Sequence, residues 1–275
     1  MKIDIHLHVT LEQLPKNEGM FLSSAENMLP HLKELGIEKG IVLSSGENMS
    51  EIRISNLDCM NIAKKFPDTY AWMCNVDDRD IESVYERLSL YKKQGAVGIG
   101  ELMINRSMED AMIQRIFQSA EELGLPVLFH MSPEVEYEYG IVDKPGLFLL
   151  EENLKRYPNL IFIGHSQPFW HEISKDCGSS IKERMEWGKG PVTAGGRVIE
   201  LFETYPNLYG DLSANSGGCA IMRDESFGLQ FLETFHKRLF FGTDMVNVDM
   251  EFPLGKWLDE ILENGKLSRE AYENI

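Results

Sequence analysis

Cysteine is scarce in this chain, and its arrangement indicates no disulfide framework. The 275 residues include four cysteines, which are far apart and form no Cys-x-x-Cys motif: Cys59, Cys74, Cys177 and Cys219. A long chain with few, scattered cysteines is typical of proteins that keep their thiols reduced. We therefore expect a cytoplasmic protein.

Positive charge and long apolar runs are scarce as well. Lys and Arg number 27 against 44 Asp and Glu, so the net charge is -17. Such a surface repels phosphate backbones and anionic lipids, and we expect neither a nucleic-acid nor a membrane partner. No apolar run reaches membrane-spanning length, and the first predicted strand leaves no room for a signal peptide. We expect a small-molecule substrate, and a homo-oligomer is compatible with the sequence.

The chain does contain a repeated alternation of strand and helix patterns. Short apolar runs, most of them preceded by Gly or Pro turn signals, predict eight strands, at 2–9, 40–44, 70–76, 96–102, 126–131, 160–165, 208–213 and 239–244. Apolar residues spaced by three and four predict helices over 50–65, 80–94, 108–123, 146–156 and 194–204. This alternation predicts an α/β fold, a (β/α)8 TIM barrel with parallel strands.

No linker, repeat or low-complexity tract divides the sequence, so we expect one barrel domain over residues 1–275. Two connections, 166–191 and 214–224, are long for such a barrel. Loops that follow barrel strands surround the active site, and 166–191 is rich in aromatic residues and glycine. It is a candidate substrate lid, although both loops could equally be insertions packed on the barrel rim.

The first strand carries His6 and His8, two residues apart. Side chains at positions i and i+2 of a strand point to the same face, so the pair can bind one metal ion. Spacing alone does not separate this from two histidines packed in an apolar core. Other candidate ligands further along the chain are needed to distinguish a metal-binding pair from two core histidines.

Ionisable residues recur where the predicted strands end. The full set, from strands one, four, five, six and eight, is His6, His8, Glu101, His130, His165 and Asp244. The C-terminal ends of barrel strands surround a common site. Burying six polar groups together is unfavourable unless they are paired or bind a cation, and this ligand mixture suits Zn²⁺ or a related divalent metal. We predict that these six side chains form a metal centre.

The motifs resemble those of the amidohydrolase superfamily, specifically its amidohydrolase-related metal-dependent hydrolases. They occur in that family's order over nearly the whole chain: Asp4-Ile5-His6-Leu7-His8, His130, Gly164-His165, Asp211-Leu212-Ser213 and Phe241-Gly242-Thr243-Asp244. The resemblance implies a metal-dependent hydrolase with a TIM barrel and one or two divalent metals per chain, Zn²⁺ in the first instance.

The fourth strand distinguishes between the metal arrangements of this superfamily. Many members carry a carboxylated lysine there, whereas this chain has Gly100-Glu101, which resembles the segment of TatD-type deoxyribonucleases where a glutamate bridges two metals. By that resemblance Glu101 bridges a metal held by His6, His8 and Asp244 and a second metal held by His130 and His165. In mononuclear relatives, including decarboxylases, the first-strand pair, the fifth-strand histidine and the eighth-strand aspartate hold one zinc, and the sixth-strand histidine contacts substrate or water.

These features predict metal-assisted hydrolysis of an amide, ester, lactone or related bond. Asp244 is predicted to take a proton from the attacking water and return it to the leaving group. His165 is predicted to hold the second metal or to stabilise developing negative charge. Two alternatives stay open: a zinc-dependent, non-hydrolytic decarboxylase of a small carboxylic acid, and a TatD-like phosphoesterase. A binding protein without activity is disfavoured because the ligand set is complete.

Three further residues are candidate substrate contacts. Arg106 follows the fourth strand and Arg223 the seventh, and either guanidinium could bind a carboxylate or phosphate, or pair with acidic neighbours on the surface. Trp170 could line the pocket or pack its loop onto the barrel. Asp211 could orient a ligand histidine. Because relatives usually continue past the last helix, we expect a C-terminus that is either truncated or unusually short.

Overall fold

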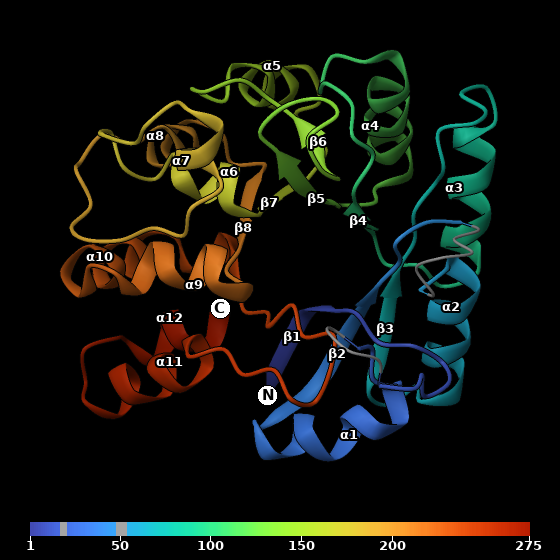
Figure 1. Ribbon diagram of the computed structural model, residues 1–275, viewed down its shortest axis with the longest axis horizontal. Helices are drawn as coiled ribbons and strands as arrows, with labels where there is room; N and C mark the ends of the chain where they lie inside the picture. Colours follow the sequence, from blue (N-terminus) through green and yellow to red (C-terminus); the bar gives the residue numbers. More distant parts are fainter. Residues whose placement is uncertain (17–20, 48–53) are drawn as a thin grey trace.

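The structure, a computed structural model, describes residues 1–16, 21–47 and 54–275. Parallel strands surround a central axis, with helices on the outside (Figure 1). The eight barrel strands are β1 Lys2–Leu7, β2 Ile37–Leu43, β3 Tyr70–Met73, β4 Ile99–Leu102, β5 Val127–Ser132, β7 Phe162–His165, β8 Leu208–Asp211 and β9 Leu239–Phe240. The predicted (β/α)8 barrel is confirmed. A short additional strand that the sequence did not predict, β6 (Ile141–Val142), pairs with β5.

The barrel closes where two sheets meet. One sheet has the order β1-β2-β3, and the other contains β4-β5-β7-β8-β9. Parallel backbone bridges join them, from Cys74 to Ile99 on one side and from Leu7 to Met245 on the other. The Gly100 amide donates to the Cys74 carbonyl at 2.9 Å, and the His8 amide donates to the Met245 carbonyl at 3.0 Å. Closure therefore brings the two ends of the sequence together beside the first strand.

Side-chain caps mark the start of several outer helices. They are α1 Ala25–Glu34, α2 Asn56–Lys65, α3 Val84–Lys93, α4 Ala111–Leu123, α5 Phe148–Arg156, α8 Arg197–Thr204, α10 Glu225–Phe235, α11 Leu254–Glu263 and α12 Arg269–Asn274. Ser55 caps α2 together with Asp58, and Asp110 caps α4. The sequence predicted that α4 begins at residue 108, whereas it begins at Ala111. The Asp110 carboxylate accepts a hydrogen bond from the Met112 amide and so fixes the first turn at that point. Residues 50–53 of the predicted 50–65 helix lie outside the described residues.

The two long connections differ from each other. Segment 166–191 contains two short helices, α6 (Gln167–His171) and α7 (Ile181–Arg184). Segment 214–224, predicted to be a long loop, is instead mostly helix α9 (Ala214–Met222), so that prediction is wrong. Two adjacent glycines are typical of a loop. Here, however, a Cβ at Gly217 would lie 2.5 Å from the Leu212 Cα, so glycine permits α9 to pack closely on the end of β8.

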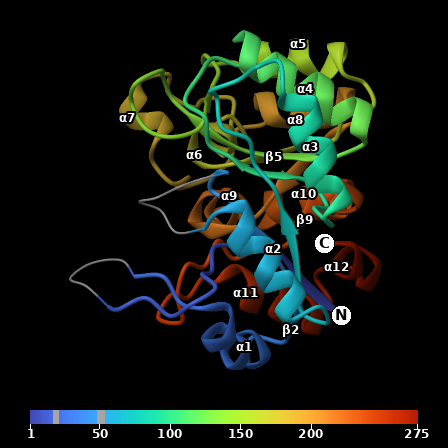
Figure 2. The ribbon, with the colours of Figure 1, turned by 90° about the vertical axis from the view of Figure 1, so that its right-hand side faces the viewer.

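Buried apolar residues form two layers, one on each side of the barrel strands. One cluster packs between the strands and the outer helices, and a second lies inside the barrel, formed by Ile5, Leu43, Met73, Leu128 and Ile163. Figure 2 separates the two ends of the barrel: the loops that follow the strands extend toward α7, and both chain termini lie at the opposite side. Among the described residues, no helix is long and apolar enough to cross a membrane.

Candidate metal centre

The six predicted ligands converge at the C-terminal ends of the strands. They come from β1 and the residue after it, β4, β5, β7 and the turn after β9, and form overlapping groups of potential metal ligands. Five of the six are buried, and only Asp244 has substantial exposure, with 26% of its side chain accessible. The sequence-based prediction that these residues share one site agrees with this geometry.

One group of donor atoms surrounds the His6 and His8 side chains. The two Nε2 atoms lie 3.0 Å apart, and Asp244 Oδ1 lies 3.3 Å from the first and 3.4 Å from the second. Glu101 Oε2 lies 3.3 Å from His8 Nε2. Donors that share a metal at about 2.0–2.2 Å are separated from one another by roughly 3–3.5 Å. The donor set and its spacing therefore fit one divalent ion.

A second group surrounds the other oxygen of Glu101. Its Oε1 atom lies 2.7 Å from His130 Nδ1 and 3.7 Å from His165 Nε2. The two oxygens of this carboxylate thus face different histidines. This arrangement allows Glu101 to contribute to two metal sites at once, as the sequence comparison of the fourth strand implies.

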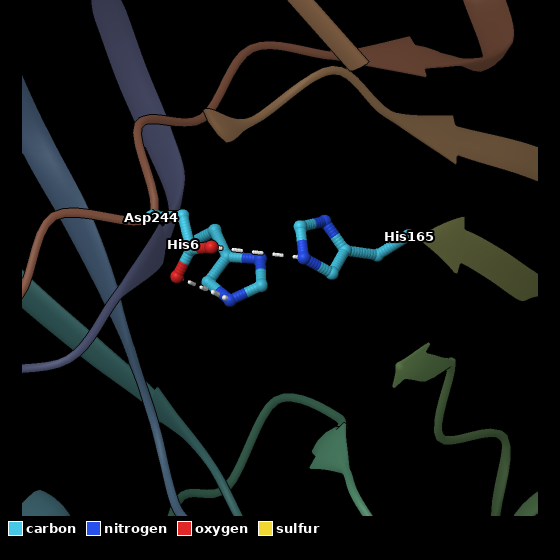
Figure 3. A group of neighbouring side chains, drawn as sticks. All are labelled: His6, His165 and Asp244. Carbon is cyan, nitrogen blue, oxygen red and sulfur yellow. Dashed lines mark ion pairs between the residues drawn. The ribbon is translucent and has the colours of Figure 1, made fainter. Parts of the chain in front are cut away.

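His165 lies between the two groups. Figure 3 shows the Asp244 carboxylate beside the His6 ring and His165 pointing toward both, with an ion-pair contact from that carboxylate to each ring. The separation is 3.7 Å between His165 Nε2 and Asp244 Oδ2. The side chains of β7 and of the turn after β9 therefore meet across the barrel mouth.

Asp211, at the end of β8, fixes two of these imidazoles. Its Oδ2 accepts a hydrogen bond from His6 Nδ1 at 2.6 Å and lies 3.1 Å from His165 Nδ1. The Ser213 hydroxyl donates to the same oxygen at 2.8 Å. With Nδ1 engaged, each ring presents its Nε2 lone pair to the centre, a common way of orienting metal-ligating histidines. The orienting role considered for Asp211 agrees with these contacts.

Asp4 links the first strand to the turn that carries Asp244. Its carboxylate accepts hydrogen bonds from the Thr243 amide at 3.0 Å and the Thr243 hydroxyl at 2.6 Å, and from the His6 amide at 3.0 Å. Burial raises the pKa of Asp4 to about 7, although these hydrogen bonds lower it. The sequence alone gives Asp4 no role, because a strand aspartate two positions before a motif histidine carries no signal of its partner 239 positions away.

The centre concentrates negative charge in a buried place. Burial raises the pKa of Glu101, but the opposing effect of His130 and the other histidines prevails, and the pKa lies well below its usual range. Burial likewise raises the pKa of Asp211, but His6 and His165 lower it to well below its usual range. Burial lowers the pKa of His6, but Asp244 and Asp211 raise it to well above its usual range. The ionised carboxylates thus surround His6, whose raised pKa favours a protonated ring, and a bound cation would compensate the same buried negative charge in place of that proton.

The two arginines predicted to contact substrate, Arg106 and Arg223, make their recorded contacts away from the six candidate ligands. The Arg106 guanidinium, 42% exposed, pairs with Asp78 at 2.7 Å and Asp110 at 3.3 Å. Arg223 donates to the Lys189 carbonyl at 3.2 Å. In the described part of the chain, the recorded hydrogen bonds and ion pairs join neither arginine to the six ligands. Their role in substrate binding stays a prediction.

Trp170 takes the packing role that the sequence left as one of two alternatives. Its side chain is buried, with 2% of the residue exposed, and its indole Nε1 donates to the Asp211 carbonyl at 2.8 Å. The indole thus supports the strand end that bears Asp211 from the outside and does not line the mouth. The burial of Trp170 favours the packing alternative, because the short helix α6, to which Trp170 belongs, turns the indole into the core.

Tyr139 is a neighbour of the site that was not predicted from the sequence. Its ring centroid lies 4.5 Å from that of His130, and 54% of the residue is exposed. Burial raises the pKa of Tyr139 to about 12, helped by the charges of Glu101 and Asp244. Its only sequence signal is its position in the loop after the fifth strand.

Comparison with known proteins agrees with this architecture. The family model described as Amidohydrolase matches residues 3–275. No curated protein matches the sequence. Among solved structures, an uncharacterised TIM-barrel protein from Bordetella bronchiseptica has 15% identity and a TM-score of 0.60, with 99% of this chain and 95% of that chain covered.

Two other similar structures carry names that describe an activity. A probable 2-pyrone-4,6-dicarboxylic acid hydrolase from Acinetobacter baumannii has 14% identity and a TM-score of 0.58, covering 98% of this chain and 97% of its own. A dihydroxybenzoic acid decarboxylase from Polaromonas, solved with bound manganese and an inhibitor, has 16% identity and a TM-score of 0.57, covering 100% and 93%. At these identities the likeness shows the fold.

Proposed function

Because the chain belongs to the amidohydrolase family, whose members include hydrolases and metal-dependent decarboxylases, we propose that it is a metal-dependent hydrolase of small molecules. The bond it cleaves is an amide, ester, lactone or related bond. The observation that carries this proposal is the division of the Glu101 carboxylate, whose Oε2 faces His8 at 3.3 Å and whose Oε1 faces His130 at 2.7 Å. A carboxylate shared in this way suits a pair of metals, which is a common arrangement for hydrolysis.

The donor atoms divide into a set of ligands for each of two metals. His6, His8 and Asp244 would hold one ion and His130 and His165 the other, with Glu101 shared. Zn²⁺ suits these ligands, and Mn²⁺ is the alternative because the similar decarboxylase structure contains it. When bound, a divalent metal supplies Lewis acidity that polarises the scissile carbonyl and lowers the pKa of water.

The protein's own groups would move the proton. Asp244 is the most accessible of the six, so its carboxylate can accept a proton from the attacking water and deliver it to the leaving group. His165, held through Nδ1 by Asp211, presents Nε2 toward Asp244 at 3.7 Å. That placement lets His165 hold the second metal or stabilise negative charge that develops on the substrate.

A zinc-dependent decarboxylase is the second candidate, and one distance favours it. The 2.7 Å separation of Glu101 Oε1 and His130 Nδ1 is that of a direct hydrogen bond. If that bond persists in the loaded protein, Glu101 Oε1 and His130 Nδ1 engage each other and neither is free to hold a second metal, which leaves Nε2 as the only ring nitrogen of His130 that can be a ligand. The centre would then hold one metal, which is the arrangement implied by the mononuclear relatives.

Metal stoichiometry separates the two candidates. Purified protein is loaded with Zn²⁺ or Mn²⁺, freed of excess ion and analysed for metal per chain by mass spectrometry. The dinuclear hydrolase predicts about two ions per chain, and about one after Glu101→Gln, which removes the shared carboxylate. One ion per chain in the wild type would favour the decarboxylase.

Activity assays on the loaded protein complete the test. An ester, a lactone and an anilide serve as hydrolase probes, and carbon dioxide release from 2,6-dihydroxybenzoate serves as the decarboxylase probe. Hydrolysis of any of the first three, lost in Asp244→Asn, supports the proposal. Carbon dioxide release without hydrolysis contradicts it.

A further inference from the structure

The loop that follows β5 places one half-exposed aromatic residue beside the metal centre. We propose that Tyr139 is a specificity-determining residue, whose ring forms one wall of the substrate site and packs against a planar, unsaturated group of the substrate. This inference rests on the proposed function, because it requires a substrate that is bound at the metal centre.

The first observation is where the ring lies. Its centroid is 4.5 Å from the His130 ring, at an interplanar angle of 53°. One side of the phenol ring therefore rests on a predicted ligand, while 54% of the residue stays accessible. An aromatic side chain that keeps this much apolar surface exposed next to a buried ionic centre is available for a ligand to cover.

The second observation is that the loop holds the ring in place. The Gly140 amide donates to the Met103 carbonyl at 2.8 Å, which ties the loop to the end of β4. Asn105 accepts a hydrogen bond from the Glu136 amide at 2.6 Å and donates to the Gly140 carbonyl at 3.1 Å. Ordering Tyr139 in advance lowers the entropy that a bound substrate would otherwise lose.

A buried arginine from the segment after β7 anchors the other end of the same loop. The Arg184 guanidinium donates to the Pro133 carbonyl at 2.8 Å and to the Asp143 carbonyl at 2.9 Å. Arg184 thereby connects segment 166–191 to the loop that carries Tyr139. The candidate lid and the aromatic wall are parts of one hydrogen-bonded rim.

The third observation is the residue that follows Tyr139. Gly140 has a φ of +114°, and a Cβ there would lie 2.9 Å from both the carbonyl oxygen and the ring Cδ2 of His130. Only glycine permits the loop to approach His130 this closely. The close approach brings the preceding ring onto the imidazole, so the contact of Tyr139 with His130 is built into the backbone.

A planar partner is the group that this wall recognises best. Aromatic rings contact other flat π systems through offset or edge-to-face packing, which a puckered saturated ring cannot match. The phenol, whose ordinary pKa is about 10, also keeps its proton at neutral pH and can donate to an oxygen of the substrate. Tyr137 in the same loop is a matched control, because it is also exposed, at 43%, and no ring contact with the centre is recorded for it in the described part of the chain.

The experiment compares two acids that differ in planarity. Benzoate and cyclohexanecarboxylate have the same charge and ring size, and each offers a carboxylate to the metal. Their affinities for Zn²⁺-loaded protein are measured by calorimetry for the wild type, Tyr139→Phe, Tyr139→Leu and Tyr137→Leu. We expect a preference for benzoate of about three- to tenfold in the wild type, Tyr139→Phe and Tyr137→Leu, and none in Tyr139→Leu.

Each outcome bears on the inference. A preference that survives in Tyr139→Leu, or that is absent from the wild type, would overturn it, as would failure of the loaded wild type to bind either acid. Bound Zn²⁺ and the melting temperature are measured for every variant, and both should stay at wild-type values because Tyr139 is half exposed. Protein that takes up no Zn²⁺ contradicts the proposed function itself, whereas normal Zn²⁺ uptake without a preference contradicts only the role of Tyr139.

Discussion

The two ends of the barrel are built from the same strands but have opposite chemistry. At the C-terminal end, the described residues include several groups of three buried or half-buried metal ligands. At the N-terminal end, an opening of about 1050 Å³ is lined by apolar side chains such as Ile3, Ile41 and Phe240, and by the Lys2–Asp259 ion pair. The donor atoms at the C-terminal end, and not the presence of an opening, therefore identify the candidate functional site.

The change from apolar to polar takes two residues along a strand. In β5, Leu128 belongs to the inner apolar cluster and His130 to the metal centre, and in β7 the same relation holds for Ile163 and His165. Side chains two apart share a strand face. The inner face of each strand thus contributes first to the core and then to the site, which suggests that stability and metal binding can be altered separately.

The largest expected effect comes from removing the first-strand histidines. His6→Ala combined with His8→Ala should abolish bound metal and reduce any hydrolytic turnover to background, because two donors of one ion are lost together. Metal per chain and turnover are measured on the same preparation. His236→Ala, on the other side of the molecule, is the control and should retain both. Full metal content in the double variant would contradict the assignment.

A smaller effect is expected from the carboxylate behind the ligands. Asp211→Asn keeps the shape of the side chain but removes the charge that holds His6 Nδ1 at 2.6 Å, so metal affinity should fall by about 10- to 100-fold. Titration against a chelating dye measures the affinity. Asp224→Asn, which alters an aspartate that caps α10, should leave affinity unchanged. Equal affinities for the two variants would show that Asp211 does not orient the ligands.

The inner apolar layer should affect stability without affecting metal. Leu128→Ala removes a fully buried side chain and is expected to lower the free energy of unfolding by about 2–5 kcal/mol. Urea unfolding of metal-free protein measures this loss. Metal per folded chain should match the wild type, because Leu128 lies one layer below His130. A loss of metal in the folded variant would mean that the two layers cannot be separated.

The smallest effect concerns an ion pair outside the barrel mouth. Hydrogen bonds from Tyr205, Lys155 and Arg197 lower the pKa of Glu151 to about 2, from its ordinary value of 4.5. Since the folded protein has the lower pKa, the stabilisation by Glu151 is present above about pH 4.5 and is lost as the pH falls toward 2.

Acid unfolding of two glutamine variants tests this difference. Glu151→Gln should be slightly less stable than the wild type at neutral pH, and the gap should close as the pH falls through that window. Melting temperatures between pH 2 and 7 measure the gap, with exposed Glu152→Gln as the control. If the difference in melting temperature between the wild type and Glu151→Gln widened on acidification, the pKa of Glu151 would not be lowered in the folded protein.

Much of this arrangement follows from local sequence patterns. The period-two alternation in β5 and β7 places His130 and His165 on the same faces as Leu128 and Ile163, as expected for strands. The first strand departs from that rule, because Ile5 lies in the inner cluster although His6 and His8 occupy the alternate positions. Its pairing with β2 shifts register between Asp4 and Leu7. Such irregularities re-aim side chains next to active sites, and no pattern in the sequence marks this one.

The partners of the ligands were harder to predict than the ligands. Asp4 lies 239 positions from Thr243, and Tyr139 meets His130 through a loop whose course depends on Asn105 and Gly140. Trp170 was ambiguous for the same reason, since its orientation depends on the short helix that follows β7. Contacts of this kind depend on loops and on closure of the barrel, which lack a short-range signal.

The sequence by itself determined the parallel barrel, the anionic character of the chain and the identity of the six candidate ligands. Strand periodicity and the position of each residue at a strand end are local properties, and parallel strands bring such ends to one face. Only the tertiary structure decided that Glu101 directs its two oxygens to different histidines, that Asp211 binds His6, and that Tyr139 borders the site. These depend on distances between side chains from separate strands and loops, which exist only after the barrel has closed.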